Sequence, residues 1–226
     1  AYEGLRSDYL RSLAALAHCA RAWREAREPD PAHVEEGIRL AARHGWHAVG
    51  NFLHHRVAQL AAAALAQGVE RDFVLQTIRQ RRLRAPHPDV ADWPWPLRIR
   101  ALGGFEVLCD GNALDFGARP QKKPLDLLRL LVARGPAPLD TATVLDALWP
   151  EADGDRAKAS LDMAVLRLRK LLGHDEALRL DHGRLGLNRT LVWVDSWAWA
   201  AGPGQPYGGP LFGDAPPELA WAAQRE

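Results

Sequence analysis

Apolar side chains recur at helical spacing through residues 1–84, which are rich in the good helix formers Ala, Leu, Arg and Glu. The first apolar stripe consists of Leu10, Leu13, Leu16 and Ala17. Pro29 breaks the pattern, and Gly45 and Gly68 punctuate it. Helical spacing between the two glycines is carried by Val49, Phe52, Leu53, Val57, Leu60 and Ala64. The pattern predicts an all-helical module of stacked helix pairs, with a last helix from about Val69 to Leu83.

The pattern changes after a proline-rich segment at residues 85–96, APHPDVADWPWP. Prolines keep a chain extended and non-helical, so this segment is predicted to be a linker. From Leu97 onward apolar and polar positions alternate, which indicates short antiparallel strands. Asp110-Gly111 tolerates positive φ angles and predicts a hairpin turn between two of these strands.

Three helices and a second hairpin are predicted after these strands. The helices run from about Lys123 to Arg134, from Thr141 to Trp149 with Asp140 as N-cap, and from Asp155 to Gly173. The segment EALRLDHGRLGLN, residues 176–188, forms two strand-like arms around His182-Gly183, and LVWVD, residues 191–195, adds a third strand. This order of elements predicts an α+β second half.

The predicted helix at residues 155–173 has two distinct faces. Its buried face is predicted to hold Leu161, Val165, Leu168 and Leu172. The opposite face carries Arg156, Ala159, Ser160, Met163, Arg167 and Lys170, with Lys158 and Arg169 at its margins. Small residues let a helix enter the major groove, arginine reads guanine, and flanking cations neutralise phosphates. The alternative is a solvated basic face on a bundle helix.

Composition excludes several function classes. The 226 residues suffice for one or two domains, and a net charge of +1 neither demands nor excludes nucleic acid. The two cysteines fit no ligand spacing and suit a reducing cytoplasm. Neither a membrane span, a signal peptide nor a phosphate loop is visible. No cofactor and no enzymatic activity are predicted. No metal site is predicted either, because the histidines at positions 44, 47, 54 and 55 lack a supporting carboxylate pattern.

Residues 97–195 resemble the DNA-binding domain of OmpR/PhoB-type regulators, and more closely its variant in SARP proteins and large MalT-like signalling ATPases. The segments that carry the resemblance are LGGFEVLCDG, KKPLDLLRLLVARG, LDALWP, AVLRLRKLLG and LRLDHGRLGL. The segment VLRLRKLLG is the most specific, because it is similar to the recognition helix of this family. Residues 1–84 resemble the end of a tetratricopeptide-like array, which precedes the DNA reader in the large ATPases.

The resemblance implies an antiparallel sheet, three helices and a C-terminal wing. Residues 156–172 are then the recognition helix for the major groove, and residues 181–185 form the wing near the minor groove. The base readers predicted from the outer face of this helix are Ala159, Ser160, Met163 and Arg167, and the resemblance places recognition-helix arginines at positions 167 and 169. The phosphate contacts predicted from the same helix are Arg156, Lys158, Arg169 and Lys170, and the resemblance adds Thr141 and Thr143. The implied wing contacts are His182 and Arg184, and an acidic loop with Glu151 and Asp153 is implied to meet RNA polymerase.

The predicted organisation is a helical sensor module at 1–84, a linker at 85–96, a winged helix at 97–199 and a Gly/Pro-rich tail at 200–226. The tail resembles the opening of a bacterial transcriptional activation domain, with a helix that carries Trp221. We expect a C-terminal fragment of a cytoplasmic transcription activator that binds double-stranded promoter DNA as a homodimer or higher oligomer, with an upstream ATPase domain and no membrane contact.

Two positions depart from the family. A Gly-Tyr pair is common after the wing turn, but this chain has Leu185-Gly186-Leu187 there, and Leu166 stands where relatives carry a polar or basic residue. Leu166 fits either a thymine methyl contact or packing. The alternative function is a protein-interaction adaptor, in which the winged helix and the helical module dock partners without DNA.

Overall fold

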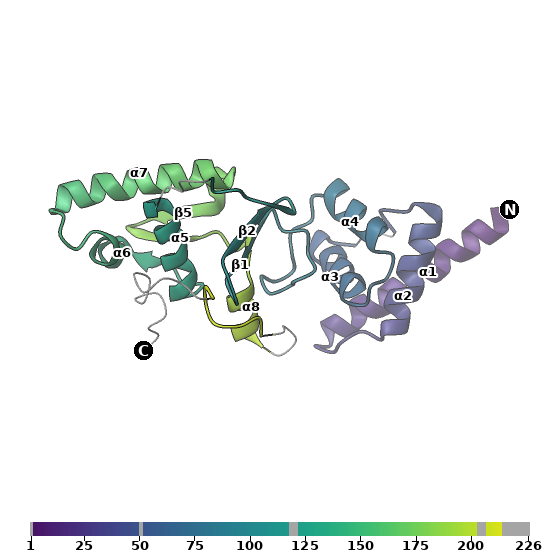
Figure 1. Ribbon diagram of the computed structural model, residues 1–226. Coiled ribbons are helices and arrows are strands. Elements are labelled where there is room, and N and C mark those ends of the chain that lie inside the picture. Colours follow the sequence, from purple (N-terminus) through teal and green to yellow (C-terminus); the bar gives the residue numbers. More distant parts are fainter. Residues whose placement is uncertain (1, 50–51, 118–121, 203–206, 214–226) are drawn as a thin grey trace. The chain divides into compact units, whose positions relative to one another are not determined.

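The computed structural model describes residues 2–49, 52–117, 122–202 and 207–213 (Figure 1). The chain divides into two compact units, residues 1–93 and residues 94–226. The division falls inside the predicted linker at residues 85–96, whose Trp93 and Trp95 are both buried. Each unit is described by itself below. No helix in the described ranges has the length and apolar character needed to span a bilayer.

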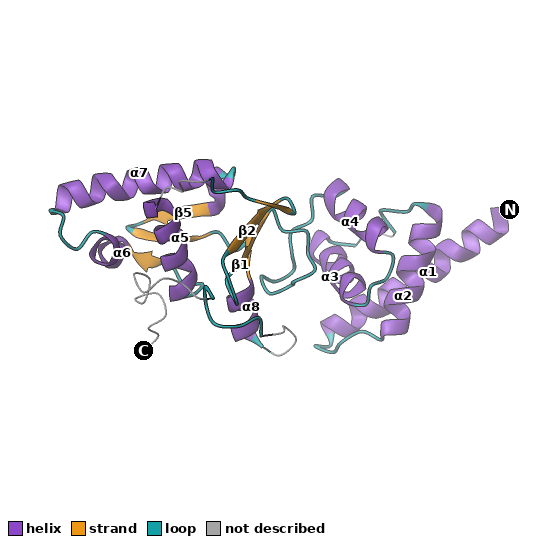
Figure 2. Cartoon of the chain, in the orientation of Figure 1, coloured by secondary structure: helices purple, strands orange, loops and turns teal. Residues whose placement is uncertain are grey.

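The described elements of unit 1 are all helices, as the sequence predicts (Figure 2). They are α1 (Tyr2–Arg24), α2 (Pro31–His44), α3 (His54–Ala66) and α4 (Arg71–Gln80). Helices α1 and α2 approach closely at Gly37, where a Cβ atom would lie 2.5 Å from Cδ2 of Leu16. The Ser12 hydroxyl donates a hydrogen bond of 2.8 Å to the Gly37 carbonyl at this crossing.

Two apolar patterns of the first unit differ from the prediction. Helix α3 begins only at His54, so Val49 and Phe52 lie before it, and its N-cap Leu53 is 66% exposed. Leu10 in α1 is also exposed, at 52%, although it shares the predicted stripe with the buried Leu16. Leu10 lies on the side of α1 away from Asp8 and Ser12, which meet His44 and Gly37 of α2.

The described residues of unit 2 form two small sheets beside its helices, so its class is α+β as predicted. The first sheet consists of β1 (Leu97–Arg100), β2 (Glu106–Cys109), β3 (Asn112–Ala113) and β7 (Val192–Val194), in the order β3-β2-β1-β7. The second has the order β4-β6-β5, from β4 (Leu139–Asp140), β5 (Leu178–Asp181) and β6 (Arg184–Leu187). The helices are α5 (Lys122–Arg134), α6 (Thr141–Leu148), α7 (Gly154–Leu172), the 3-10 turn η1 (Asp175–Ala177) and α8 (Asp195–Ala201).

Strand β7 follows the second hairpin in the sequence, but it does not join the sheet of that hairpin. It pairs in parallel with β1, in the register Leu97 with Val192. The carboxylate of Asp195, directly after β7, accepts hydrogen bonds from the backbone N–H groups of Ala101 and Leu102, at 2.8 and 3.1 Å. The chain therefore returns to the first sheet with β7 and continues into α8, which the sequence analysis did not predict.

One residue in the described part of the tail, Phe212, belongs to the core of unit 2. Phe212 is 6% exposed and packs edge-on against Phe105, with ring centroids 5.5 Å apart. The N–H of Gly103 donates to the carbonyl of Pro210 at 2.8 Å, and Leu102 forms a β-bridge with Leu211. The expected tail helix with Trp221 lies outside the described residues.

Candidate nucleic-acid interface

Helix α7 is the longest helix of unit 2, and its two ends are well defined. The Asp153 carboxylate accepts a hydrogen bond of 3.1 Å from the Arg156 N–H, which caps the first turn. Gly173 ends the helix in a left-handed conformation, with φ of 69°. The predicted core face is confirmed, since Leu161, Val165, Leu168 and Leu172 are buried. Ala157 and Ala164 complete this face, which packs on α5.

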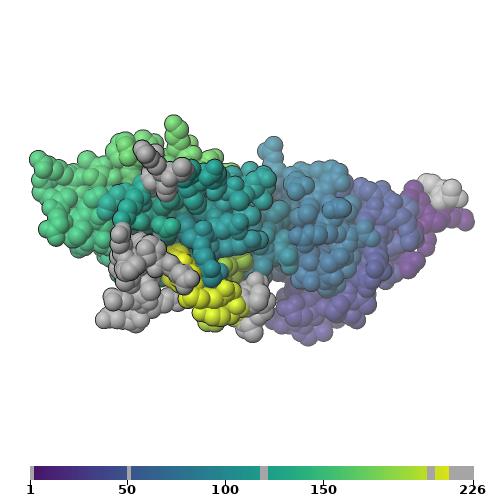
Figure 3. Space-filling model, viewed as in Figure 1, coloured from purple at the N-terminus to yellow at the C-terminus, as the bar shows by residue number. Residues whose placement is uncertain are grey.

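The outward face of α7 has an apolar centre. Ala159, Met163, Leu166 and Lys170 follow one another at spacings of three and four residues, so they share one line along the helix. The Met163 side chain is 46% exposed and Leu166 is 59% exposed. In the view of Figure 3, α7 lies in the green upper edge of unit 2. The centre of the outward face therefore exposes apolar surface to a partner. The charged side chains of this face lie at its margins and at the C-terminal end of the helix.

A groove of about 390 Å³ runs along one flank of α7. Its lining consists of Lys123, Pro124, Trp149, Ala159, Ser160, Met163, Ala164 and Arg167. All four predicted base readers are in this set, so the structure brings them together on the side of α7 that faces the start of α5. The small side chains of Ala159 and Ser160 leave the space that the groove occupies.

The opposite wall of the groove is formed by Lys123, Pro124 and Trp149, which the sequence analysis did not assign to the site. The ammonium of Lys123 donates a hydrogen bond of 2.6 Å to the Leu148 carbonyl and lies 5.5 Å from the centre of the Trp149 ring. This bond satisfies a carbonyl at the end of α6. The small side chains at positions 159 and 160 indicate open space beside the helix. The residues that form the opposite wall lie elsewhere in the sequence, so the sequence pattern of the helix does not identify them.

The predicted phosphate contacts of α7 fall into two groups. Lys158, Arg167 and Lys170 are exposed and form no hydrogen bond or ion pair with the described residues. Arg156 is also exposed, and its Nε atom lies 3.6 Å from the Asp153 carboxylate. Arg169 is partly buried, and its guanidinium donates a hydrogen bond of 2.9 Å to the Leu178 carbonyl. Arg169 thus fixes strand β5 to the helix, and its contact with phosphate stays a prediction.

The second hairpin is tied to the start of α6. His182 and Gly183 form its turn with φ angles of 46° and 73°, the left-handed pair that suits a tight hairpin. The N–H of Thr141, the first residue of α6, donates to the Gly183 carbonyl at 2.8 Å. Thr141 is half-buried and Thr143 is exposed. Asp140 is the N-cap residue as predicted, but its side chain makes no capping hydrogen bond.

The two predicted wing contacts, His182 and Arg184, each lie close to an aspartate. The His182 ring is 91% exposed and lies 2.7 Å from the Asp181 carboxylate. The Arg184 guanidinium donates to the Pro138 carbonyl at 2.8 Å and lies 3.7 Å from the Asp140 carboxylate. The hairpin therefore presents less unpaired positive charge than α7 does. In the loop before α7, Glu151 and Asp153 are exposed, and Asp153 caps the helix.

Comparisons with known proteins add little to this geometry. No protein-family model matches the chain, and no curated protein matches it. Among solved structures, Mycobacterium tuberculosis EmbR in complex with a low affinity phosphopeptide is 22% identical, with a TM-score of 0.38. The match covers 53% of this chain and 38% of the EmbR chain. A TM-score this low assigns neither the family nor the fold of EmbR to this chain. The function proposed below therefore rests on the residues of the chain itself.

Proposed function

We propose that unit 2 is an OmpR-type winged helix that binds double-stranded DNA. Helix α7 is the recognition helix in the major groove, and the turn at residues 181–185 is the wing near the minor groove. The order of α5, α6 and α7 followed by the β5–β6 hairpin supports this assignment. The Arg169–Leu178 hydrogen bond supports it further, because it holds the hairpin beside the helix.

The observation that carries the proposal is the set of unpaired cations on α7. Lys158, Arg167 and Lys170 have no partner within the described part of the chain, and Asp162 is the one acid between Arg156 and Gly173. Lys158 and Arg167 lie on opposite flanks of the small and apolar central line, and Lys170 lies near its C-terminal end. The phosphates on the two sides of the DNA major groove are complementary to such an arrangement of cations. Arg167, which lines the hollow beside α7, is then placed to reach the base edges.

The regulatory context is part of the same proposal. The protein acts as a non-enzymatic transcription activator of the SARP-like kind, with two or more copies on repeated half-sites. A single small module buries too little surface for high specificity, which favours more than one copy. The exposed Glu151 faces RNA polymerase, because an acidic loop is repelled by phosphate.

Selection from a random duplex library tests DNA binding directly. The full chain is expected to enrich a short motif, and fluorescence anisotropy then gives its affinity over a range of salt concentrations. Arg167→Ala is expected to lose about 1–3 kcal/mol on the selected motif and to relax its sequence preference. Lys158→Ala is expected to weaken binding to all duplexes alike and to reduce the salt slope by about one.

A control separates these effects from a general loss of positive charge. Arg100 is exposed on β1 and pairs with Glu106, at 2.8 Å, far from α7 in the sequence. Arg100→Ala removes one positive charge and should leave motif preference and salt slope unchanged. If Arg167→Ala behaves like Arg100→Ala at every salt concentration, α7 is not the reading element.

The exposed Met163 and Leu166 favour a second candidate function, the docking of a protein partner on the same face of α7. Apolar side chains at the centre of a face and charges at its margin are typical of protein interfaces. The salt titration separates the two functions. If the chain retains no duplex at low salt, protein docking is the better assignment, since even non-specific DNA binding is strong under that condition.

A further inference from the structure

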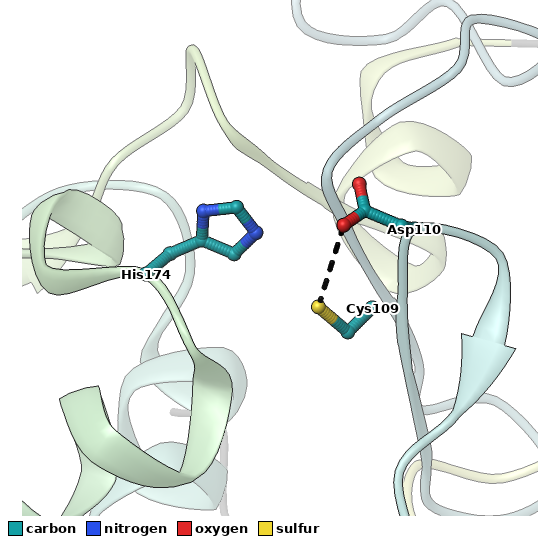
Figure 4. Close-up of side chains that lie close together, drawn as sticks. All are labelled: Cys109, Asp110 and His174. Atoms are coloured by element: carbon teal, nitrogen blue, oxygen red, sulfur yellow. Dashed lines mark hydrogen bonds between the residues drawn. The ribbon is translucent and has the colours of Figure 1, made fainter.

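Three side chains that bind metals in proteins meet beyond the C-terminal end of α7. Cys109 is the last residue of β2, Asp110 is in the turn after it, and His174 follows the last turn of α7. One ligand atom from each residue can be chosen so that all three lie within 4.8 Å of one another. Figure 4 shows the imidazole of His174 directed toward the thiol and the carboxylate.

The backbone holds these three residues in place. Cys109 pairs with Leu97 on one side and with Asn112 on the other, so β2 is fixed within its sheet. Asp110 adopts a left-handed conformation with φ of 48°, and its N–H donates to the Pro96 carbonyl at 2.8 Å. Gly173, with φ of 69°, turns the chain out of α7 and brings His174 toward β2. The ligands therefore come from ordered segments of two separate elements.

The end of α7 provides a second observation that points to a cation. The Cys109 thiol donates a hydrogen bond of 3.8 Å to the carbonyl oxygen of Leu172, the last residue of the helix. The last carbonyls of a helix have no partner within the helix and carry partial negative charge. A cation at this point is favoured by the helix end as well as by the three side chains.

We propose that Cys109, Asp110 and His174 bind a Zn²⁺ ion, with water as the fourth ligand. Thiolate, imidazole and carboxylate together are a donor set that suits zinc, whereas magnesium and calcium take oxygen ligands. On binding, the thiol releases its proton to solvent and a Zn–S bond forms. Zinc–ligand bonds of about 2.0–2.3 Å place the ligand atoms of a tetrahedral site about 3.6 Å apart. The ligand atoms therefore need to move by about 1 Å, which side-chain rotation allows.

Zinc at this point joins the β2–β3 turn to the end of α7. The hydrogen bond from Cys109 to Leu172 already joins the first sheet to the end of the long helix, and the metal adds a bond through His174 at the same point. His174 is 64 residues along the chain from Asp110 and 65 from Cys109, so zinc binds the folded state in preference and stabilises it. This inference is independent of DNA binding, since none of the three ligands lines the groove of α7.

Cobalt titration of the full chain tests the site, since Co²⁺ replaces zinc and its bond to a thiolate absorbs in the near ultraviolet. The wild-type chain is expected to bind one Co²⁺ with this absorption band and to release it to Zn²⁺. Zinc is expected to raise the melting temperature of the chain. Cys109→Ser should abolish the band, and His174→Gln and Asp110→Asn should each weaken zinc binding at least about tenfold.

The variants and a matched control keep the test independent of folding. Asparagine tolerates the left-handed conformation of residue 110, so Asp110→Asn preserves the turn while it removes the carboxylate. Cys19→Ala changes the other cysteine, which is buried in unit 1, and should keep the band. The proposal is wrong if the wild type shows no thiolate band, if the band survives in Cys109→Ser, or if His174→Gln and Asp110→Asn bind zinc as the wild type does.

Discussion

The guanidinium of Arg169 on α7 donates a hydrogen bond of 2.9 Å to the carbonyl oxygen of Leu178, the first residue of β5. This bond joins the proposed recognition helix to the proposed wing. The backbone bond from Thr141 to Gly183 joins the far end of the same hairpin to α6. The hairpin is therefore held at both ends, and its position relative to α7 is set before any partner binds.

Arg169→Met is expected to lower the free energy of unfolding of unit 2 by about 1–2 kcal/mol. Methionine keeps much of the buried stem but leaves the Leu178 carbonyl without its charged donor. Urea unfolding monitored by circular dichroism measures the change. Arg179→Met is the control, because Arg179 is exposed on the same strand without a partner among the described residues, and its expected change is under about 0.5 kcal/mol. Equal effects of the two variants would show that the bond does not stabilise the hairpin.

Gly37→Ala is expected to destabilise unit 1, although alanine is the better helix former. The new Cβ would lie 2.5 Å from Cδ2 of Leu16, which is itself 4% exposed and cannot move aside freely. Overpacking of this kind costs about 1–3 kcal/mol, against a propensity gain of about 1 kcal/mol. Gly4→Ala is the control, because nothing lies within 4 Å of its added Cβ. A rise in the thermal midpoint with Gly37→Ala would contradict close packing of α1 on α2.

Phe212→Ala is expected to destabilise unit 2 by about 3 kcal/mol, since the ring is buried against Phe105 in the core. Tyr207→Ala removes a ring of similar size from the same segment, but Tyr207 is 61% exposed, and its removal should cost much less. Chemical unfolding of both variants measures the difference. If the two variants are equally stable, residues 207–213 are a loose tail rather than part of the domain.

Asp8→Asn is expected to make unit 1 less stable at neutral pH and to reduce its sensitivity to acid. A hydrogen bond from His44, at 3.0 Å, and the nearby Arg43 lower the pKa of Asp8 below its usual 3.8. A group whose pKa is lowered in the folded state stabilises it above the unfolded-state pKa, and this contribution is lost as the pH falls through the lower value. Wild type and variant should therefore converge in stability as the pH falls below the lowered pKa of Asp8.

Urea midpoints at neutral and acidic pH measure this convergence. Glu28→Gln is the control, since Glu28 is an exposed carboxylate in the loop after α1 without an ion pair among the described residues. A stability gap between wild type and Asp8→Asn that stays constant with pH would show that the carboxylate charge is not what stabilises this contact.

Local patterns predicted the elements that depend on neighbouring residues. The buried face of α7 follows from the helical repeat of Leu161, Val165, Leu168 and Leu172, and both hairpin turns follow from Asp110-Gly111 and His182-Gly183, which adopt the left-handed angles. Patterns failed where burial depends on a distant partner. Leu10 and Leu53 look like core positions but are exposed, because Leu10 lies on the side of α1 away from α2 and Leu53 precedes the first turn of α3.

The sequence by itself determined the helical first unit, the α+β second unit and the two faces of α7, because periodicity and turn chemistry act over a few residues. Only the tertiary structure decided that β7 pairs with β1, that Lys123 and Trp149 complete the groove of α7, and that Cys109 lies beside His174. Each of these contacts joins residues well apart along the chain. Their approach depends on the packing of whole elements, which no local pattern encodes.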